Sequence, residues 1–473
     1  MTKANGKRLW VLGAGVLLLA ARPAAAQQTV QRSDVSRLPS AVHRPPSADA
    51  APDETPAAFW AVLGDTTLSR LIIQALSANR DVQAAHARVM SARAERTRAG
   101  LGLTPSLTAD AGYARQQYSN SSFPGVVGTL PAQDAYQAGL NLGWEIDVFG
   151  RNRKNWQGRR SVASSTQEDL RNVQVQVSAE LATAYFDLAG ARDRLATARR
   201  NVDNMRSTLT LTQDRLAAGR GNAFDSERAR AQLSSTLAEL PRIEAAVDVI
   251  QQRIAVLTGG AVTRVDEAAT SEAWPTLPDS ITVPSVDAVV DGRPDVRSAQ
   301  HRSAAQSAFA GSASADYLPR IALIGSAGYL SGSSATFGDQ GTGRYTIGAA
   351  VSWPLLDLGR VKADADAARA GADEARAQYQ QAQFRAREDL ATALVNYQRA
   401  RERLTYLDDA ASASERAMEL ARVRFQEGAT DFLQVLDAQR TLLAAQDRRS
   451  TGRTDATDAL VAVYRALGGN WPR

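Results

Sequence analysis

The residue types that carry most enzyme chemistry are scarce in this chain. It has no cysteine, and its three histidines, His43, His86 and His301, are far apart in sequence. A disulfide, a cysteine-based zinc site and a thiol nucleophile are therefore excluded, and isolated histidines favour surface or core roles over metal binding. We find no phosphate-binding glycine loop, no serine-elbow motif and no histidine placed to act as a base. The sequence predicts no enzyme, no cofactor and no bound metal.

The residues best spaced to act electrostatically are Leu433, Asp437 and Arg440, which follow one another at spacings of four and three. These spacings place the three side chains on one face of a helix. Taken alone, Asp437 and Arg440 are expected to form a surface ion pair worth about 0.2–0.5 kcal/mol. Any further role depends on the elements that position them.

The chain contains an internal duplication. Residues 144–258 match residues 353–467 at a constant offset of 209 without a gap. Upstream, Pro105 matches Pro319 at an offset of 214. A constant spacing on both sides of a variable segment indicates rigid elements that flank a loop-bearing hairpin.

Each repeat contains one very long predicted helix, over 151–218 and over 360–427. Neither segment contains proline, which would break a helix. Each covers 68 residues, or about 100 Å at about 1.5 Å per residue. A heptad seam of mostly small residues predicts close lateral packing. Its members are Val361, Ala365, Ala368, Ala372, Ala375, Tyr379, Ala382 and Ala386.

Each long helix ends at a glycine, Gly219 or Gly428. A glycine at this place predicts a left-handed helix cap, and therefore hairpin tips at 219–222 and 428–431. Return helices are expected over about 222–257 and 429–467. Because the first is shorter than its partner, a helix over about 81–100 is expected to stack on its end.

Four short segments alternate between apolar residues and polar or small residues: 106–115, 136–146, 320–329 and 345–353. This length and alternation are typical of transmembrane β-strands, with the apolar face toward lipid. Four strands leave open edges, which a bilayer does not tolerate. The strands therefore predict two or more copies in one barrel, the alternative being soluble hairpins that cap a helical bundle.

The first residues have the pattern of an export signal. Lys3, Lys7 and Arg8 precede the apolar run Leu9–Ala20, and an A-x-A pattern ends at Ala26. We expect cleavage after Ala26, an uncleaved N-terminal anchor being the alternative. Four of the 55 Lys and Arg residues and none of the 50 Asp and Glu residues lie in this signal, so the mature chain has a net charge of +1. Such a charge gives no support for a nucleic-acid partner.

The expected domain organisation follows from these elements. It comprises a signal peptide (1–26), an extended N-terminal arm (27–60), repeat 1 (61–258, with a β-hairpin at 105–147), an inter-repeat linker (259–288), repeat 2 (289–468, with a β-hairpin at 319–354) and a C-terminal tail (469–473).

Together these features resemble the outer-membrane efflux protein family of the TolC type, over about residues 60–471. The segments that carry the resemblance are Gly292–Arg297, Trp144–Arg151, Trp353–Arg360 and Gly428–Leu442. The ending Tyr464–Trp471 resembles the subgroup that serves resistance-nodulation-division pumps.

The resemblance implies a mainly α fold with a small transmembrane β part. Three copies would form a twelve-stranded β-barrel in the outer membrane, continued by an α-helical barrel in the periplasm. The function implied is that of a passive exit duct for drugs or other small solutes. The partners implied are a periplasmic adaptor, an inner-membrane transporter of the resistance-nodulation-division type and outer-membrane lipid. Many members of the subgroup are lipoproteins, whereas this chain has no cysteine to carry the lipid.

Two alternatives remain open. The same architecture serves as the outer-membrane duct of type I protein secretion. A periplasmic coiled-coil scaffold would explain the helices but not the alternating strands.

The resemblance further implies site residues near the second tip. The family's pore constriction falls on Leu433, Asp437 and Arg440. Three-fold symmetry would turn Asp437 into a carboxylate ring that favours cations, and Leu433 into an apolar collar.

Tip closure, by the same resemblance, falls on Asp225, Phe425 and Thr430. The chain departs from the family here, because Phe425 replaces a tyrosine and Thr430 replaces an arginine. The second carboxylate of some members corresponds to Gln434.

The tips themselves are expected to face the adaptor through Arg215, Gly219, Arg424 and Gly428. The alternative for the two glycines is plain helix capping.

Overall fold

The computed structural model describes residues 60, 65–118, 131–260, 262, 264–265, 274, 276–281, 283 and 285–469. The expected signal peptide, the N-terminal arm before Trp60 and the tail after residue 469 lie outside the described residues.

Two helices of extreme length dominate the chain from Glu54 onward, which forms one compact unit. Helix α4 covers the 67 residues Arg151–Ala217, and α9 covers the 69 residues Leu358–Gln426, so the two predicted long helices are confirmed. The other helices are α2 (Thr66–Ala78), α3 (Arg80–Leu101), α5 (Ala223–Leu257), α7 (Val286–Gly292), α8 (Pro294–Ala315) and α10 (Phe432–Ala466). Among the described helices, none is both long and apolar enough to cross a bilayer.

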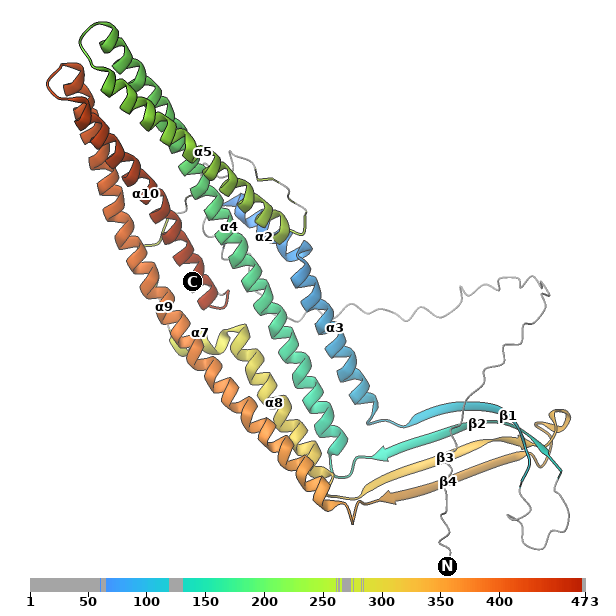
Figure 1. Ribbon diagram of the computed structural model, residues 1–473. Coiled ribbons are helices and arrows are strands. Elements are labelled where there is room, and N and C mark those ends of the chain that lie inside the picture. Colours follow the sequence, from blue (N-terminus) through green and yellow to red (C-terminus); the bar gives the residue numbers. More distant parts are fainter. Residues whose placement is uncertain are drawn as a thin grey trace, which may run out of the picture. The chain divides into compact units, whose positions relative to one another are not determined.

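The helices lie side by side (Figure 1). Helix α4 packs against α3 and α5 on one flank and against α8 and α10 on the other, and α9 packs against α8 and α10. Every member of the predicted heptad seam of α9 is buried or half-buried, because its small side chains face these neighbours. Close approach recurs between α4 and α10, where a Cβ added at Gly190 would lie 2.2 Å from the hydroxyl oxygen of Thr454.

The predicted end-to-end stacking of α5 on α3 is confirmed. The amide nitrogen of Asn79 donates to the carbonyl oxygen of Leu257, the last residue of α5, at 2.9 Å. The amide oxygen of the same side chain accepts from the backbone N–H groups of Asp81 (2.8 Å) and Val82 (3.2 Å) at the start of α3. One asparagine therefore caps two helix ends that would otherwise leave unpaired groups.

Repeat 2 makes the matching junction with Arg293. Its guanidinium donates to the carbonyl oxygens of Ala466, the last residue of α10, at 3.2 Å and of Ala386 in α9 at 3.4 Å. It also pairs with the carboxylates of Asp295 (2.7 Å) and Asp389 (3.0 Å). Burial opposes the charge of this side chain, but the two carboxylates raise the pKa of Arg293 above its usual value. The junction of α10, α8 and α9 is thus held by one buried cation.

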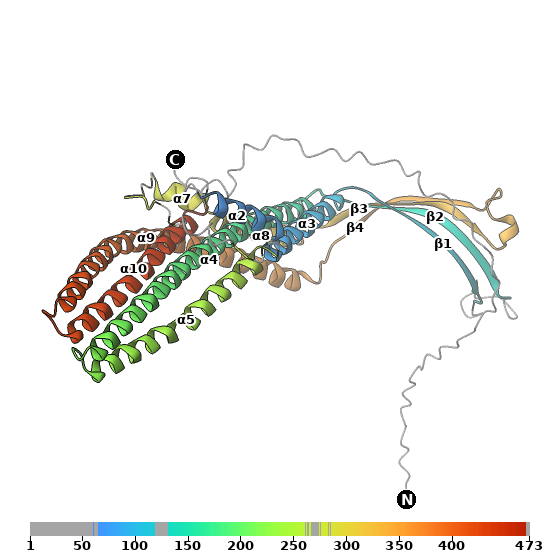
Figure 2. The same ribbon diagram turned by 90° about the horizontal axis from the view of Figure 1, so that it is seen from above.

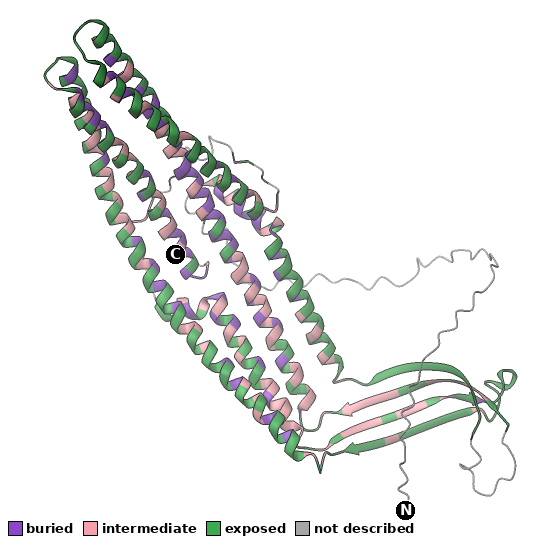
Figure 3. Ribbon diagram, in the orientation of Figure 1, coloured by how far each residue is buried: buried purple, intermediate pink, exposed green. Residues whose placement is uncertain are grey.

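The core lies midway along the long helices, where the buried residues concentrate (Figure 3). Tyr185, Phe186 and Leu188 of α4 pack there against Ile72 of α2. The ring of Trp60 contacts that of Tyr464, with centroids 4.6 Å apart. Figure 2 shows α2 and α7 on the same side of the helical layer. A second buried cluster lies between α9 and α10 and includes Leu390 and Leu460. Leu277 and Ile281 of the expected linker pack against this cluster.

The four predicted strands form one antiparallel sheet in the order β1-β2-β3-β4. The strands are β1 (Ser106–Gln116), β2 (Gln133–Ile146), β3 (Arg320–Ser331) and β4 (Gly343–Ser352). Their register pairs Leu107 with Leu142 and Trp144 with Leu323, which puts the large apolar side chains of different strands on one face, as predicted. On that face Ile347 is 78% exposed. Among the described residues, β1 and β4 each keep one unpaired edge.

The duplicated tryptophans join the sheet to the helices. The indole N–H of Trp144 donates to the carbonyl oxygen of Leu103 at 3.1 Å, and that of Trp353 donates to Tyr317 at 3.0 Å. The first bond joins the end of β2 to the residues that precede β1, and the second joins the end of β4 to the residues that precede β3. The two hairpins are therefore held to the helices by equivalent bonds.

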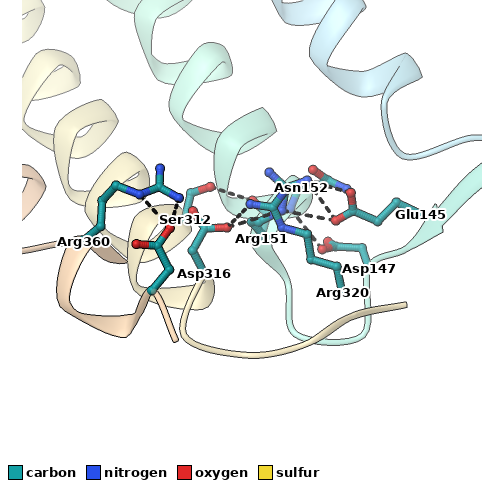
Figure 4. Close-up of polar contacts among 9 residues, drawn as sticks. Glu145, Asp147, Arg151, Asn152, Ser312, Asp316, Arg320 and Arg360 are labelled. Atoms are coloured by element: carbon teal, nitrogen blue, oxygen red, sulfur yellow. Dashed lines mark hydrogen bonds and ion pairs between the residues drawn. The ribbon is translucent and has the colours of Figure 1, made fainter. Parts of the chain in front are cut away.

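Arg151, at the start of α4, anchors the same region (Figure 4). It forms a bidentate pair with Glu145, with distances of 2.7 and 2.8 Å, and lies 3.9 Å from Asp316. Asp147 accepts from the backbone N–H of Asn152 at 3.0 Å, where a negative charge complements the helix N-terminus. These contacts form a polar network at the end of the sheet where its strands join the helices (Figure 4).

Candidate functional site

The tips of both helical hairpins are built by glycine caps. Gly219 and Gly428 adopt positive φ angles of 68° and 76°, a conformation that favours glycine. Beyond them, the N–H of Arg220 bonds to the carbonyl of Arg215, and that of Ala429 to the carbonyl of Arg424, both at 2.8 Å. These are the bonds of a Schellman cap, so both glycines cap helices whether or not they also meet an adaptor.

The second return helix begins at Phe432, three residues later than the expected start at 429. Asp431 is the reason, because its carboxylate accepts from the backbone N–H of Gln434 at 3.1 Å and fixes the helix N-terminus there. In the first hairpin, Asn222 plays the same role by accepting from the N–H of Asp225 at 2.8 Å. The first return helix, α5, matches its predicted span and continues through Pro241.

Arg215 connects the two hairpins near their tips. Its guanidinium donates to the backbone carbonyl of Phe425 at 2.9 Å and lies over the phenyl ring, 4.4 Å from the centroid. Its counterpart Arg424 is exposed, and its side chain makes no hydrogen bond or ion pair to the described residues. The duplicated arginines therefore differ in role, because only Arg215 has an aromatic ring and a carbonyl facing it.

Phe425 belongs to a small core that joins the hairpins. It is 8% exposed, its ring lies 5.7 Å from that of Phe432, and Ala229 of α5 lies in the same cluster with Val435 and Leu436. Packing and the contact with Arg215 therefore hold the phenyl ring in place.

The other predicted closing residues do not meet one another within the chain. Thr430 bonds through its hydroxyl to the side-chain oxygen of Gln434 at 2.5 Å. The carboxylate of Asp225 has no hydrogen-bond or ion-pair partner among the described residues. Their role in tip closure stays a prediction.

The three predicted constriction residues do not all lie together: Leu433 and Asp437 face one groove, and Arg440 contacts α5. Leu433 is 50% exposed, and Asp437 is exposed beside it. Arg440 reaches α5 instead, where its Nε donates to the side-chain oxygen of Gln232 at 3.1 Å. The expected surface ion pair between Asp437 and Arg440 is not formed among the described residues, so that interpretation was wrong.

Leu433 and Asp437 line a shallow groove of about 800 Å³ between α9 and α10. Ala417 and Ala421 form its opposite wall. Because the alanines opposite it are small, the carboxylate of Asp437 is open to solvent. No cation among the described residues pairs with this carboxylate, so the groove has a negative charge at its surface.

A second polar region escaped the sequence analysis. A cavity of about 1000 Å³ lies where α10 ends and α8 begins, and both Asp187 and Asp458 line it. One carboxylate oxygen of Asp458 is buried without a hydrogen-bond partner. Burial, together with the charges of Asp187 and Asp455, raises the pKa of Asp458 to about 7. The available signal was a carboxylate inside the largely apolar stretch that ends α10.

Comparison with known proteins decides the family. The model of the outer membrane efflux protein family matches residues 71–260 and 286–469. The chain belongs to the outer membrane efflux protein family. Its curated relatives include the outer membrane protein OprJ of Pseudomonas aeruginosa, 30% identical over 86% of this chain and 85% of that protein. The pyoverdine export outer membrane protein OpmQ of the same species is 29% identical over 87% of each chain.

The solved structures of family members share the fold. The outer-membrane channel OprN superposes with a TM-score of 0.82 at 33% identity, over 90% of this chain and 95% of that chain. VceC from Vibrio cholerae gives a TM-score of 0.78 at 25% identity, over 88% and 99%. The predictions of an efflux function and of an outer-membrane location are thereby confirmed: the chain is an outer-membrane efflux channel protein.

Proposed function

We propose that three copies of the chain form one continuous conduit, the exit duct of a tripartite pump that expels drugs or other small solutes. The observation that carries this proposal is the four-stranded sheet, which has two open edges in the described part of the chain. Unpaired edge groups are not tolerated in a bilayer. Three sheets joined edge to edge give twelve strands, with the exposed apolar faces toward lipid and the polar faces toward the lumen.

The helical layer supports the same assembly, because its two outer flanks, formed by α9 and α5, expose apolar side chains among the described residues. On α9, Phe384 and Tyr406 are large and exposed, and on α5, Val249 and Val256 are exposed as well. Exposed apolar rows on opposite flanks of one layer suit pairing between successive copies. The inference of three copies comes from the family, since edge pairing alone sets only a minimum of two.

The tip of the second hairpin forms the constriction in this proposal. Three copies of Asp437 would make a ring of like charges that attracts cations, and Leu433 would make an apolar collar one turn away. Arg440 is assigned to the α5 contact with Gln232, which leaves Asp437 without a neutralising partner. Arg215 and Phe425 hold each protomer's two hairpins together, and Asp225 and Thr430 are left to contact the next copy.

The partners follow from the family. The tip turns at Gly219 and Gly428 are proposed to face a periplasmic adaptor. Of the two arginines predicted there, Arg424 supplies the exposed cation, whereas Arg215 contacts Phe425 instead. The adaptor would couple the duct to an inner-membrane transporter of the resistance-nodulation-division type.

Single-channel conductance in a planar bilayer tests the constriction. Asp437→Ala should reduce cation selectivity and increase conductance, because it removes three charges from the narrowest level. The matched control is Asp214→Ala, which removes an exposed carboxylate near the tip of the first hairpin. Equal behaviour of the two variants would move the constriction elsewhere, and the absence of conductance steps from inserted protein would refute the conduit.

A further inference from the structure

The first helical hairpin contacts the second along α4 and α10, and small side chains make this contact close. A Cβ added at Gly190 would collide with Thr454, and the hydroxyl of Ser450 donates to the carbonyl oxygen of Gly190 at 3.3 Å. Toward the tips, Arg194 of α4 pairs with Asp447 of α10 at 2.7 Å. We name these five residues the hairpin seam. Whatever loosens the seam frees one hairpin from the other.

Two carboxylates lie at the end of the hairpin seam that is farther from the tips. Asp187 precedes Gly190 by three residues, and Asp458 follows Thr454 by four, so each is about one helical turn from the closest contact. Both carboxylates line the cavity of about 1000 Å³ and are half-buried. One oxygen of Asp458 is buried without a hydrogen-bond partner. Packing of the two helices therefore brings two acids together where water solvates them only in part.

None of the cations around the cavity is paired with these two carboxylates. The other ionisable groups that line it are Glu180 of α4, Arg253 of α5, Arg293 and Asp295 at the start of α8, Glu388 and Asp389 of α9, and Arg465 of α10. Arg253 bonds to Glu180 at 2.7 Å, and Arg293 bonds to its two carboxylate partners at the α8–α9 junction. Arg465 is exposed, and its side chain makes no hydrogen bond or ion pair to the described residues. The two carboxylates thus have no cation in contact with them.

Burial and like charge both favour the neutral form of a carboxyl group. Burial raises the pKa of Asp187 above its ordinary value. For Asp458, burial and the charges of Asp187 and Asp455 raise the pKa to about 7, although a hydrogen bond with Thr183 opposes the shift. Asp455 is itself paired with Arg403 at 2.6 Å. Two acids that interact in this way titrate together, so the pair holds a proton below about pH 7 and is fully ionised above it.

We propose that Asp187 and Asp458 form a proton-sensitive latch on the hairpin seam. While the pair holds a proton, α4 and α10 stay in contact. When the proton leaves, two like charges in a partly desolvated place repel each other, and the cavity beside them gives the helices room to separate. The contact between the two hairpins therefore weakens as the pH rises through about 7. The latch lies within one chain, so it depends neither on the number of copies nor on membrane insertion.

Two measurements on the purified protein in detergent test the latch at about pH 6 and about pH 8, on either side of the expected titration. Infrared difference spectra report protonated carboxyl groups through their C=O stretch. Hydrogen exchange, divided by the intrinsic rate at each pH, reports opening of the seam segments 186–194 and 450–458, with the segment 160–170 of α4 as the internal reference. Asp458→Asn removes the titrating group, and Asp409→Asn removes an exposed carboxylate of α9 as the matched control.

Exchange of the seam segments should rise about tenfold between the two pH values in the wild type and in Asp409→Asn, because the two pH values differ by about one bound proton. In Asp458→Asn this exchange should not depend on pH, and the carboxyl band at the lower pH should be smaller. Equal exchange of the wild-type seam at both pH values overturns the latch without need of any variant. An equal rise in segment 160–170 also overturns it, because the pH would then act on the whole chain. A carboxyl band unchanged in Asp458→Asn overturns it as well, because the proton would lie elsewhere.

Discussion

Replacing Arg293 by methionine should destabilise the chain more than loss of any exposed arginine. The side chain of Arg293 is 9% exposed and bonds two carboxylates and two backbone carbonyls. Methionine would fill much of the volume but leave the carbonyl oxygen of Ala466 without a partner, which costs about 1–3 kcal/mol. The carboxylates of Asp295 and Asp389 are 38% and 57% exposed, so water compensates them, and each lost pair adds only about 0.2–1 kcal/mol.

The expected total is a loss of about 2–4 kcal/mol in the free energy of unfolding. Arg293→Lys should lose about half of this, because an ammonium keeps the charge but not the planar fork that reaches several acceptors. The matched control is Arg302→Met, which removes a bidentate pair with Asp169 whose partners are 58% and 40% exposed, at a cost of about 0.2–1 kcal/mol.

Thermal unfolding of the purified variants in detergent, followed by circular dichroism of the helices, measures these differences. The order of midpoints should be wild type and Arg302→Met highest, Arg293→Lys intermediate and Arg293→Met lowest. A midpoint for Arg293→Met equal to that of Arg302→Met would refute the reasoning, since it would mean that the buried junction contributes no more than a surface pair.

Three further predictions follow from particular contacts. Gly190→Ala should destabilise the chain by about 1–3 kcal/mol, measured as a lower unfolding midpoint, because the added methyl would collide with Thr454. The control Gly371→Ala on α9 should be neutral or stabilising, since nothing lies within 4 Å of its added Cβ. Equal effects of the two substitutions would contradict the close contact at Gly190. Arg215→Ala should accelerate hydrogen exchange at both tip turns, because the two hairpins lose the contact between Arg215 and Phe425. The control Arg424→Ala should leave exchange unchanged. Unchanged exchange in both variants would argue against a connection of the hairpins through Arg215. The pKa of Asp458 is raised from 3.8 to about 7, so the folded state binds a proton that the unfolded state releases, and stability should fall as pH rises from about 4 to about 7. Asp458→Asn should flatten this dependence in a pH series of unfolding midpoints, and an unchanged slope would contradict it.

The tips illustrate where inference from sequence stopped. Helix, glycine and return helix could be placed within a few residues, because caps and periodicity are local properties. Arg215 and Arg424 occupy matching positions in the duplication, and nothing local distinguishes them. Only the packing of α4 against the second hairpin brings Phe425 under one guanidinium and leaves the other exposed.

The constriction residues show the same limit. Helical spacing correctly put Leu433 and Asp437 side by side, but it also predicted an ion pair with Arg440 that does not form. An exposed i,i+3 pair is worth little, so the contact with Gln232 on a neighbouring helix, 208 residues away in sequence, determines where Arg440 lies.

The sequence by itself determined the duplication, the two long helices, the four strands and the face that each strand exposes. These follow from composition and from periods of 3.5 and 2, which neighbouring residues enforce. The tertiary structure alone decided the junctions made by Asn79 and Arg293 and the buried carboxylate of Asp458. Each of these depends on which distant backbone carbonyl or charge lies within a few ångströms, and that is fixed only when the helices have packed.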